Sequence, residues 1–141
     1  MSIPTLPRFN TLTLLHNPAC SKSRAALALL QERAPSAQPP FELDVVDYLK
    51  TPLTKTQLRS LTSYLVAGDS NAGSLRQLLR DEPEINSTVG TTPTAEQLVQ
   101  VLHEHPAWMQ RPIAVDWVRG RAVIGRPPEA VLAIAEGVGE A

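Results

Sequence analysis

The sequence feature that most constrains the fold is a strand–helix–strand order in the first third of the chain. Thr11–Leu15 is short, apolar and partly β-branched, which predicts a strand. Ser21–Arg33 is rich in Ala and Leu and contains no Gly or Pro, which favours a helix. Phe41–Tyr48 starts with alternating apolar and polar residues and then becomes β-branched, which predicts a second strand. Two strands connected in this way form a parallel pair with a right-handed crossover.

The only cysteine, Cys20, lies between the first strand and its helix. Unpaired backbone N–H groups and the helix dipole favour negative charge at a helix N-terminus, so a thiolate forms more easily there. The same N–H groups can bind an oxyanion. The pattern therefore indicates a nucleophilic sulfur beside an anion pocket. The alternative is that Cys20 is an inert buried residue, and that His16 before it only ends the strand.

The middle of the chain is predicted to be helical. Thr54 is positioned to cap the first of these helices, and Thr94 with Gln97 has the spacing of a capping box at the start of the last. We expect Glu82–Pro93 to be irregular. The predicted helices are Lys55–Val66, Ser74 to about Asp81, and Thr94 to about His103.

The last third of the chain returns to strands. Ile113–Val118 and Ala122–Ile124 flank Arg119-Gly120-Arg121, which predicts a hairpin. A closing helix over Glu129–Glu136 is stopped by Gly137. The expected order is β-α-β, a helical insertion, then β-β-α.

Length and composition limit the domain organisation. The chain has 141 residues, enough for one domain with a proper core. We expect a lead-in over residues 1–10, a single domain over 11–136 with its insertion at about 52–110, and a tail over 137–141.

Composition also limits the partners and the compartment. The formal net charge of −1 gives no reason to expect nucleic acid or a membrane surface as a partner. No apolar run approaches the ~20 residues of a spanning helix, and Met1–Asn10 lacks the apolar segment of a signal peptide. A single cysteine rules out an internal disulfide. Together with the absence of an export signal, this predicts a cytoplasmic location. We also expect a monomer.

Four segments in compatible order resemble the glutaredoxin-coupled arsenate reductases, the ArsC-like family of thioredoxin-fold proteins. The resemblance extends from about Thr11 to Ala135. His16–Cys20 matches the active-site loop, and Ser74–Arg80 matches the inserted helix that ends in an active-site arginine. Arg111–Ile113 matches the arginine and proline before the third strand, and Gly125–Pro128 contains the arginine that opens the last helix.

The resemblance implies an α/β thioredoxin-like fold with a mixed central sheet. It also implies that Arg80, Arg111 and Arg126 converge on Cys20 and clamp a tetrahedral oxyanion, because guanidinium groups bind such anions through paired hydrogen bonds. We place Ser23 in the same oxyanion site. Several guanidiniums near one thiol would also lower its pKa.

Two further residues have roles in the family. His16 assists ionisation of the cysteine through the hydrogen bonds around the loop. Pro112 corresponds to the thioredoxin-fold proline, usually cis, that faces the thiol.

The resemblance further implies arsenate reduction to arsenite, an arsenic-detoxification reaction. Cys20 attacks arsenate, glutathione attacks the adduct, and glutaredoxin reduces the mixed disulfide. An external resolving thiol suits a chain with one cysteine. Glutathione is thus a co-substrate, with no tightly bound cofactor.

Two alternatives remain open at this stage. One is a glutathione-linked thiol oxidoreductase acting on another substrate. The other is a non-catalytic, transcription-associated binding protein. The retained arginines disfavour both, because neither function needs an oxyanion clamp. No metal site is expected, and His103, His105, Trp108 and Trp117 are interpreted as structural.

Overall fold

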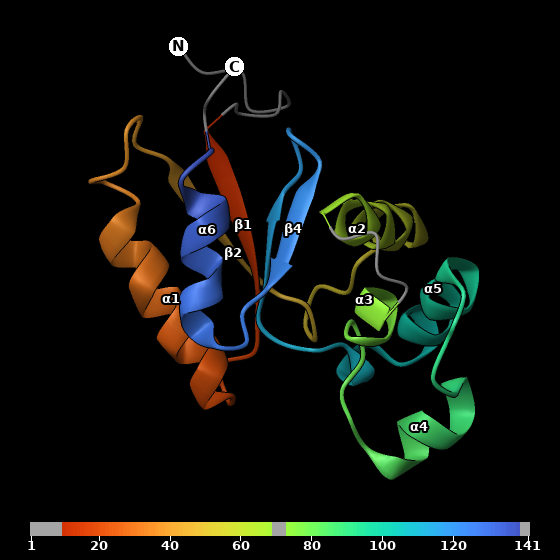
Figure 1. Ribbon diagram of the computed structural model, residues 1–141. Helices are drawn as coiled ribbons and strands as arrows, with labels where there is room; N and C mark the ends of the chain where they lie inside the picture. The colour runs from red at the N-terminus through yellow and green to blue at the C-terminus, as the bar shows by residue number, and fades with distance from the viewer. Residues whose placement is uncertain (1–9, 69–72, 139–141) are drawn as a thin grey trace.

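The computed structural model describes residues 10–68 and 73–138 and contains an open sheet with helices on both faces (Figure 1). Residues 1–9 of the lead-in predicted for residues 1–10, and residues 139–141 of the tail predicted for residues 137–141, lie outside these ranges. The strands are β1 (Thr11–His16), β2 (Glu42–Asp47), β3 (Ile113–Asp116) and β4 (Arg121–Ile124). The helices are α1 (Ser21–Arg33), α2 (Lys55–Gly68), α3 (Gly73–Arg76), α4 (Pro83–Val89), α5 (Ala95–Glu104) and α6 (Val131–Ala135), with short 3₁₀ turns at Pro106–Trp108 and Pro128–Ala130.

The sheet is mixed, as predicted. Its strand order is β2-β1-β3-β4. Strands β1 and β2 are parallel, with His16 opposite Asp47 at the end of the register. Strand β3 runs antiparallel to both β1 and β4. The ends of β1, β2 and β4 and the start of β3 therefore lie along one edge of the sheet.

Alternation along the strands divides the core between the two faces of the sheet. Leu12, Leu14 and Ala114 are buried on the face that α1 and α6 cover. Leu15 and Ile113 point to the other face, where they join the buried side chains of α2 and α5. Figure 1 shows this three-layer arrangement, with α1 and α6 on one side and the insertion on the other.

Two of the inserted helices start where the caps were predicted. Thr54 Oγ1 accepts a hydrogen bond from the Gln57 N–H at 3.1 Å, and Gln57 Oε1 accepts one from the Thr54 N–H at 2.9 Å, which completes a capping box. At α5, Thr94 Oγ1 accepts a hydrogen bond from the Gln97 N–H at 3.1 Å.

The centre of the insertion differs from the prediction. The helix predicted over Ser74–Asp81 ends at Arg76, because Leu79 pairs with Met109 in an antiparallel bridge and extended backbone cannot continue a helix. The segment Glu82–Pro93 is not irregular throughout. It contains α4, which has Pro83 in its first turn and buries Ile85 and Val89.

The hairpin and the C-terminus are close to the prediction. Strand β3 ends at Asp116, two residues before the predicted end, since the Asp116 carboxylate accepts the backbone N–H groups of Val118 and Arg119 in the turn. Gly120 has φ +71°, a conformation that favours glycine. The closing helix is split into a 3₁₀ turn and α6.

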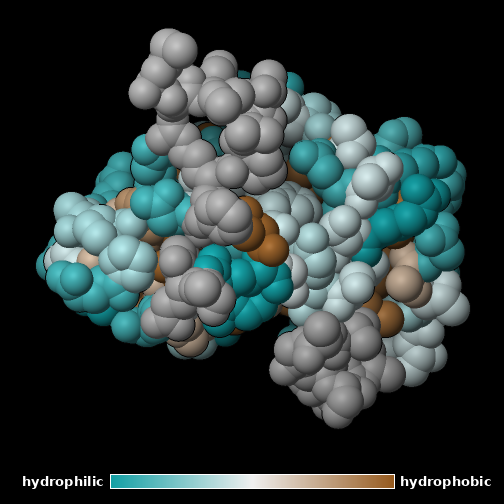
Figure 2. Space-filling model, turned by 90° about the horizontal axis from the view of Figure 1, so that it is seen from above, coloured by the Kyte–Doolittle hydropathy of each residue, from teal (hydrophilic) through white to brown (hydrophobic). Residues whose placement is uncertain are grey.

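The two tryptophans pack against the core as expected. Trp117 lies edge-on to Tyr64 with ring centroids 6.0 Å apart, and Trp108 stacks on His105 at 4.0 Å. The face shown in Figure 2 is mostly hydrophilic, with hydrophobic residues in small separate areas. Within the described ranges, no helix is both long enough and apolar enough to cross a membrane.

Candidate active site

The predicted site residues gather because of the sheet topology. The loop Asn17–Cys20 follows β1, and Arg126 follows β4 by two residues. Arg111 precedes β3, which runs in the opposite direction to β1. The strands therefore deliver the cysteine and two of the three predicted arginines to the same edge of the sheet.

The cysteine loop is held by its own hydrogen bonds. The Cys20 N–H donates to the Asn17 carbonyl at 3.0 Å, and Asn17 Oδ1 accepts the Ala19 N–H at 3.0 Å. Ser23, which is fully buried, accepts the Asn17 N–H at 3.0 Å, and its Oγ lies 2.7 Å from His16 Nδ1. These bonds fix the position of Cys20 at the N-cap of α1.

The environment of Cys20 favours the thiolate. Burial raises the pKa of Cys20, but a hydrogen bond from Arg111, the backbone N–H groups of Ser23 and Lys22, and the positive charge of Arg111 lower it. The net result is a pKa below that of an ordinary thiol. An accessible thiolate is the reactive form of cysteine.

Arg126 and Arg111 are connected to each other and to the sulfur. Arg126 Nη2 lies 3.9 Å from Cys20 Sγ, and Arg126 Nε donates to the Arg111 carbonyl at 2.9 Å. The Arg111–Pro112 peptide is cis, as predicted for this position. Gly125 donates to the Pro112 carbonyl at 2.8 Å and allows a close approach, since a Cβ on Gly125 would lie 2.8 Å from the Pro112 ring.

Arg80 belongs to the insertion, and its side chain is paired with another residue. Its backbone N–H donates to the Trp108 carbonyl at 2.9 Å, which ties it to the segment before Arg111. Its guanidinium forms an ion pair with Glu82. Among the contacts of the described residues, Arg80 makes no hydrogen bond to Cys20. Its charge is therefore partly compensated.

His16 contacts the cysteine loop through Ser23. Burial lowers the pKa of His16, Asp47 opposes that shift, and Arg24 adds to it. The neutral imidazole can accept a hydrogen bond from the Ser23 hydroxyl at Nδ1, while the Ser23 oxygen accepts a hydrogen bond from the Asn17 N–H. His16 is thus placed to orient Ser23 and the loop.

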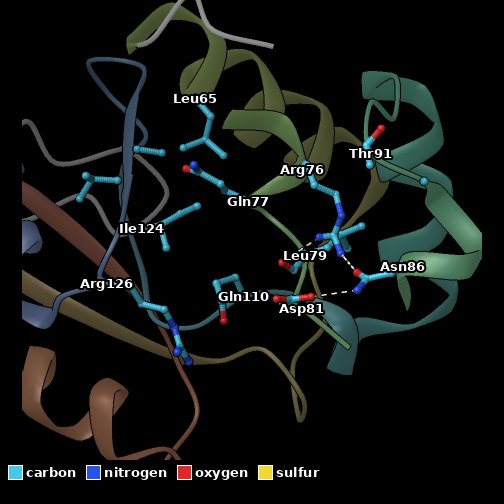
Figure 3. Close-up of a pocket in the computed structure, with 13 residues that line it drawn as sticks. Leu65, Arg76, Gln77, Leu79, Asp81, Asn86, Thr91, Gln110, Ile124 and Arg126 are labelled. Carbon is cyan, nitrogen blue, oxygen red and sulfur yellow. Dashed lines mark hydrogen bonds between the residues drawn. The ribbon is translucent and has the colours of Figure 1, made fainter. Parts of the chain in front are cut away.

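A cavity of about 790 Å³ opens beside Arg126 (Figure 3). Ile124 and Leu65 line one part of it, and Arg76 and Asn86 lie across from them. The Arg76 guanidinium donates to the Leu79 and Arg80 carbonyls at 3.2 Å each, and is thereby held at the wall. The cavity is much larger than a tetrahedral oxyanion and has the size of small-molecule sites.

Sequence reasoning missed three residues at the site. Glu82 was assigned to an irregular segment, Asn17 had no role beyond the loop motif, and Tyr48 was only the end of a strand. The available signal for Tyr48 was its position after the second parallel strand, where ligand sites of α/β sheets lie. Among the described residues, no group of three or more His, Cys, Asp or Glu side chains could hold a metal ion.

A mixed sheet with a cysteine at the N-terminus of its first helix, and a cis proline before the neighbouring strand, defines a thioredoxin-like protein with an activated thiol. A sequence model of the ArsC family matches residues 15–134. The chain belongs to the ArsC family.

Individual relatives agree with this assignment. The chain is 38% identical to the uncharacterised protein YfgD of Escherichia coli over 124 residues, which cover 86% of this chain and 93% of that protein. It is 34% identical to an arsenate reductase of Neisseria meningitidis, over 87% of this chain and 97% of the relative. The solved arsenate reductase from Vibrio cholerae superposes with a TM-score of 0.69 at 32% identity, covering 90% and 99% of the two chains.

Proposed function

We propose that this protein is an arsenate reductase that uses Cys20 as its nucleophile and a small thiol as its reductant. The observation that carries the proposal is the pairing of a cysteine of lowered pKa with two arginines, one of which lies 3.9 Å from the sulfur. Membership of the ArsC family and arsenate reductases among the relatives support the oxyanion as arsenate.

The reaction balances with one protein thiol and external thiols. The Cys20 thiolate attacks As(V), and a hydroxide or water leaves. Glutathione then attacks the adduct, so that two sulfurs lose one electron each and As(V) becomes As(III). Arsenite leaves, and Cys20 remains as a mixed disulfide with glutathione. A glutaredoxin thiol displaces Cys20 by thiol–disulfide exchange and restores the free thiol.

The arginines neutralise the anion during the first step. Arg111 and Arg126 hold it beside the sulfur, and Arg80 joins them after exchanging Glu82 for the anion. Backbone N–H groups at the start of α1 add to the oxyanion site, with Ser23 holding that turn in place. His16 supports the loop through Ser23.

The cavity beside Arg126 is the proposed place for the second thiol. It adjoins the guanidinium of Arg126, which lies 3.9 Å from Cys20 Sγ, and its volume exceeds the requirement of arsenate alone. A tripeptide such as glutathione fits the size class. In this proposal glutathione is a co-substrate without a tightly bound cofactor, and the protein acts as a cytoplasmic monomer with glutaredoxin as its partner.

The test is arsenite formation by purified protein with glutathione, glutaredoxin and its reductase, with Cys20→Ser as the blank. Turnover that disappears in the blank supports the proposal. Arg111→Ala and Arg126→Ala should lose arsenate reduction far more than turnover of a neutral glutathione mixed disulfide, whereas Arg59→Ala, on the exposed side of α2, should lose neither. Equal losses on both substrates would favour a general thiol oxidoreductase. A chain without turnover and with slow alkylation of Cys20 would favour a binding protein.

A further inference from the structure

Two buried polar atoms near Cys20 have no hydrogen-bond partner among the described residues. They are the hydroxyl oxygen of Tyr48 and Nε of Arg111. Buried polar groups are nearly always paired, because an unpaired one costs about 1–3 kcal/mol. Two such atoms in one neighbourhood need a physical explanation.

Tyr48 lies at the active-site edge of the sheet. It follows β2 directly, and the parallel register places His16 opposite Asp47, so Tyr48 ends up level with Asn17. Its side chain is 1% exposed, and its ring lines a small gap with Leu58 and Met109 of the insertion. The ring therefore has a packing role, but the hydroxyl does not contribute to it.

The charges around Tyr48 are those of the site. Burial raises the pKa of Tyr48, the positive charge of Arg111 lowers it, and a thiolate at Cys20 raises it. The Asn17 side chain also lowers this pKa through a polar interaction with the hydroxyl, but that interaction falls short of hydrogen-bond geometry. The hydroxyl therefore stays protonated and neutral at physiological pH. A neutral hydroxyl can accept one hydrogen bond and donate another.

The two orphan atoms are chemically complementary, since Nε–H of an arginine only donates and a phenol oxygen can accept. We propose that Tyr48 is a positioning residue for Arg111: when a tetrahedral oxyanion draws the Arg111 guanidinium into its bound orientation, Nε–H donates to the Tyr48 hydroxyl. This inference rests on the proposed function, because it presupposes an oxyanion beside Cys20.

The consequence is that the two unpaired atoms destabilise the site without a bound oxyanion, and that they become paired when the oxyanion binds. Tyr48→Phe keeps the ring and removes the hydroxyl, so the empty protein should be as stable as the wild type or more stable. The same substitution should weaken oxyanion binding roughly 10- to 150-fold, the value of one hydrogen bond to a charged group. A purely structural tyrosine would show neither this separation nor any coupling to Arg111.

The experiment is a double-mutant cycle in a Cys20→Ser background, with arsenate as the probe and no thiol reductant present. Arsenate affinity is measured by calorimetry for the parent, Tyr48→Phe, Arg111→Ala and the double variant. We expect Tyr48→Phe to weaken binding when Arg111 is present and to have no further effect when Arg111 is absent. Tyr64→Phe, which alters the tyrosine beside Trp117, is the matched control and should bind as the parent does.

Each outcome decides the matter. Unchanged affinity in Tyr48→Phe, or the same loss with and without Arg111, overturns the inference. If wild-type protein reduces arsenate while Tyr48→Phe is normal in binding and in KM, only the role of Tyr48 fails. If the parent does not bind arsenate and the wild type does not reduce it, the proposed function itself fails.

Discussion

Ser23 is the residue through which the stability of the cysteine loop can be tested most directly. It is fully buried, and its hydroxyl is shared between the Asn17 N–H at 3.0 Å and His16 Nδ1 at 2.7 Å. Ser23→Ala removes both contacts without changing the helix that follows. Both partners then lose the hydrogen bond that compensated for their burial.

The magnitude follows from these two orphaned groups. At about 1–3 kcal/mol for each unsatisfied buried group, and with some access of water at Asn17, the loss should be about 2–4 kcal/mol. For a chain of this size that corresponds to a decrease in Tm of roughly 6–15 °C. Helix propensity opposes this only slightly, since alanine is favoured over serine by about 0.5 kcal/mol.

The assay is thermal and urea unfolding of Ser23→Ala beside Ser21→Ala. Ser21 is exposed at the start of the same helix, so its variant should remain within about 0.5 kcal/mol of the wild type. Alkylation of Cys20 should also become slower in Ser23→Ala, because the loop no longer holds the sulfur at the helix N-terminus. Equal stabilities for the two serine variants would refute the view that Ser23 holds the loop.

Three further predictions concern charge. Burial lowers the pKa of His16, so as the pH falls below about 6.5 the unfolded chain takes up a proton that the folded chain does not. The free energy of unfolding, measured by urea titration at several pH values, should therefore decline in this range. The decline should be less steep in His16→Asn. Since the pKa of Cys20 is lowered, its alkylation rate should reach half-maximum at a lower pH than that of a free cysteine thiol, and Arg111→Ala should move that midpoint upward; an unmoved midpoint contradicts the role of Arg111. Glu82→Gln releases Arg80, so the KM for arsenate should fall a few-fold in steady-state kinetics; a rise would mean that Glu82 positions Arg80 instead.

Local sequence signals predicted the parts of the fold that depend on neighbouring residues. The bounds of α1 agree with the prediction, since a long Ala- and Leu-rich segment without breakers has strong helix propensity. The caps Thr54 and Thr94 act between residues three apart, so they can be read from the chain. The cis peptide before Pro112 came from the family resemblance rather than from any local signal.

The errors occur where distant segments decide the structure. Ser74–Asp81 has helical periodicity, but Leu79 pairs with Met109, which is thirty residues away and invisible to a local pattern. The short helix α4 depends on burying Ile85 and Val89 against the insertion. Arg80 was predicted as a member of the clamp, and its ion pair with Glu82 becomes apparent only in three dimensions.

The site therefore has a fixed part, Arg111 and Arg126, and an exchangeable part, Arg80. Hydrogen bonds to backbone carbonyls hold the fixed part, because the Arg126 side chain donates to the Arg111 carbonyl and the Gly125 N–H donates to the Pro112 carbonyl. Arg80 belongs to the insertion and must give up an ion pair before it can bind an anion. Arg111 lowers the pKa of the thiol, together with the backbone N–H groups at the start of α1. Loss of Arg80 should therefore weaken anion binding while leaving the pH midpoint of Cys20 alkylation where it is, and loss of Arg111 should change both.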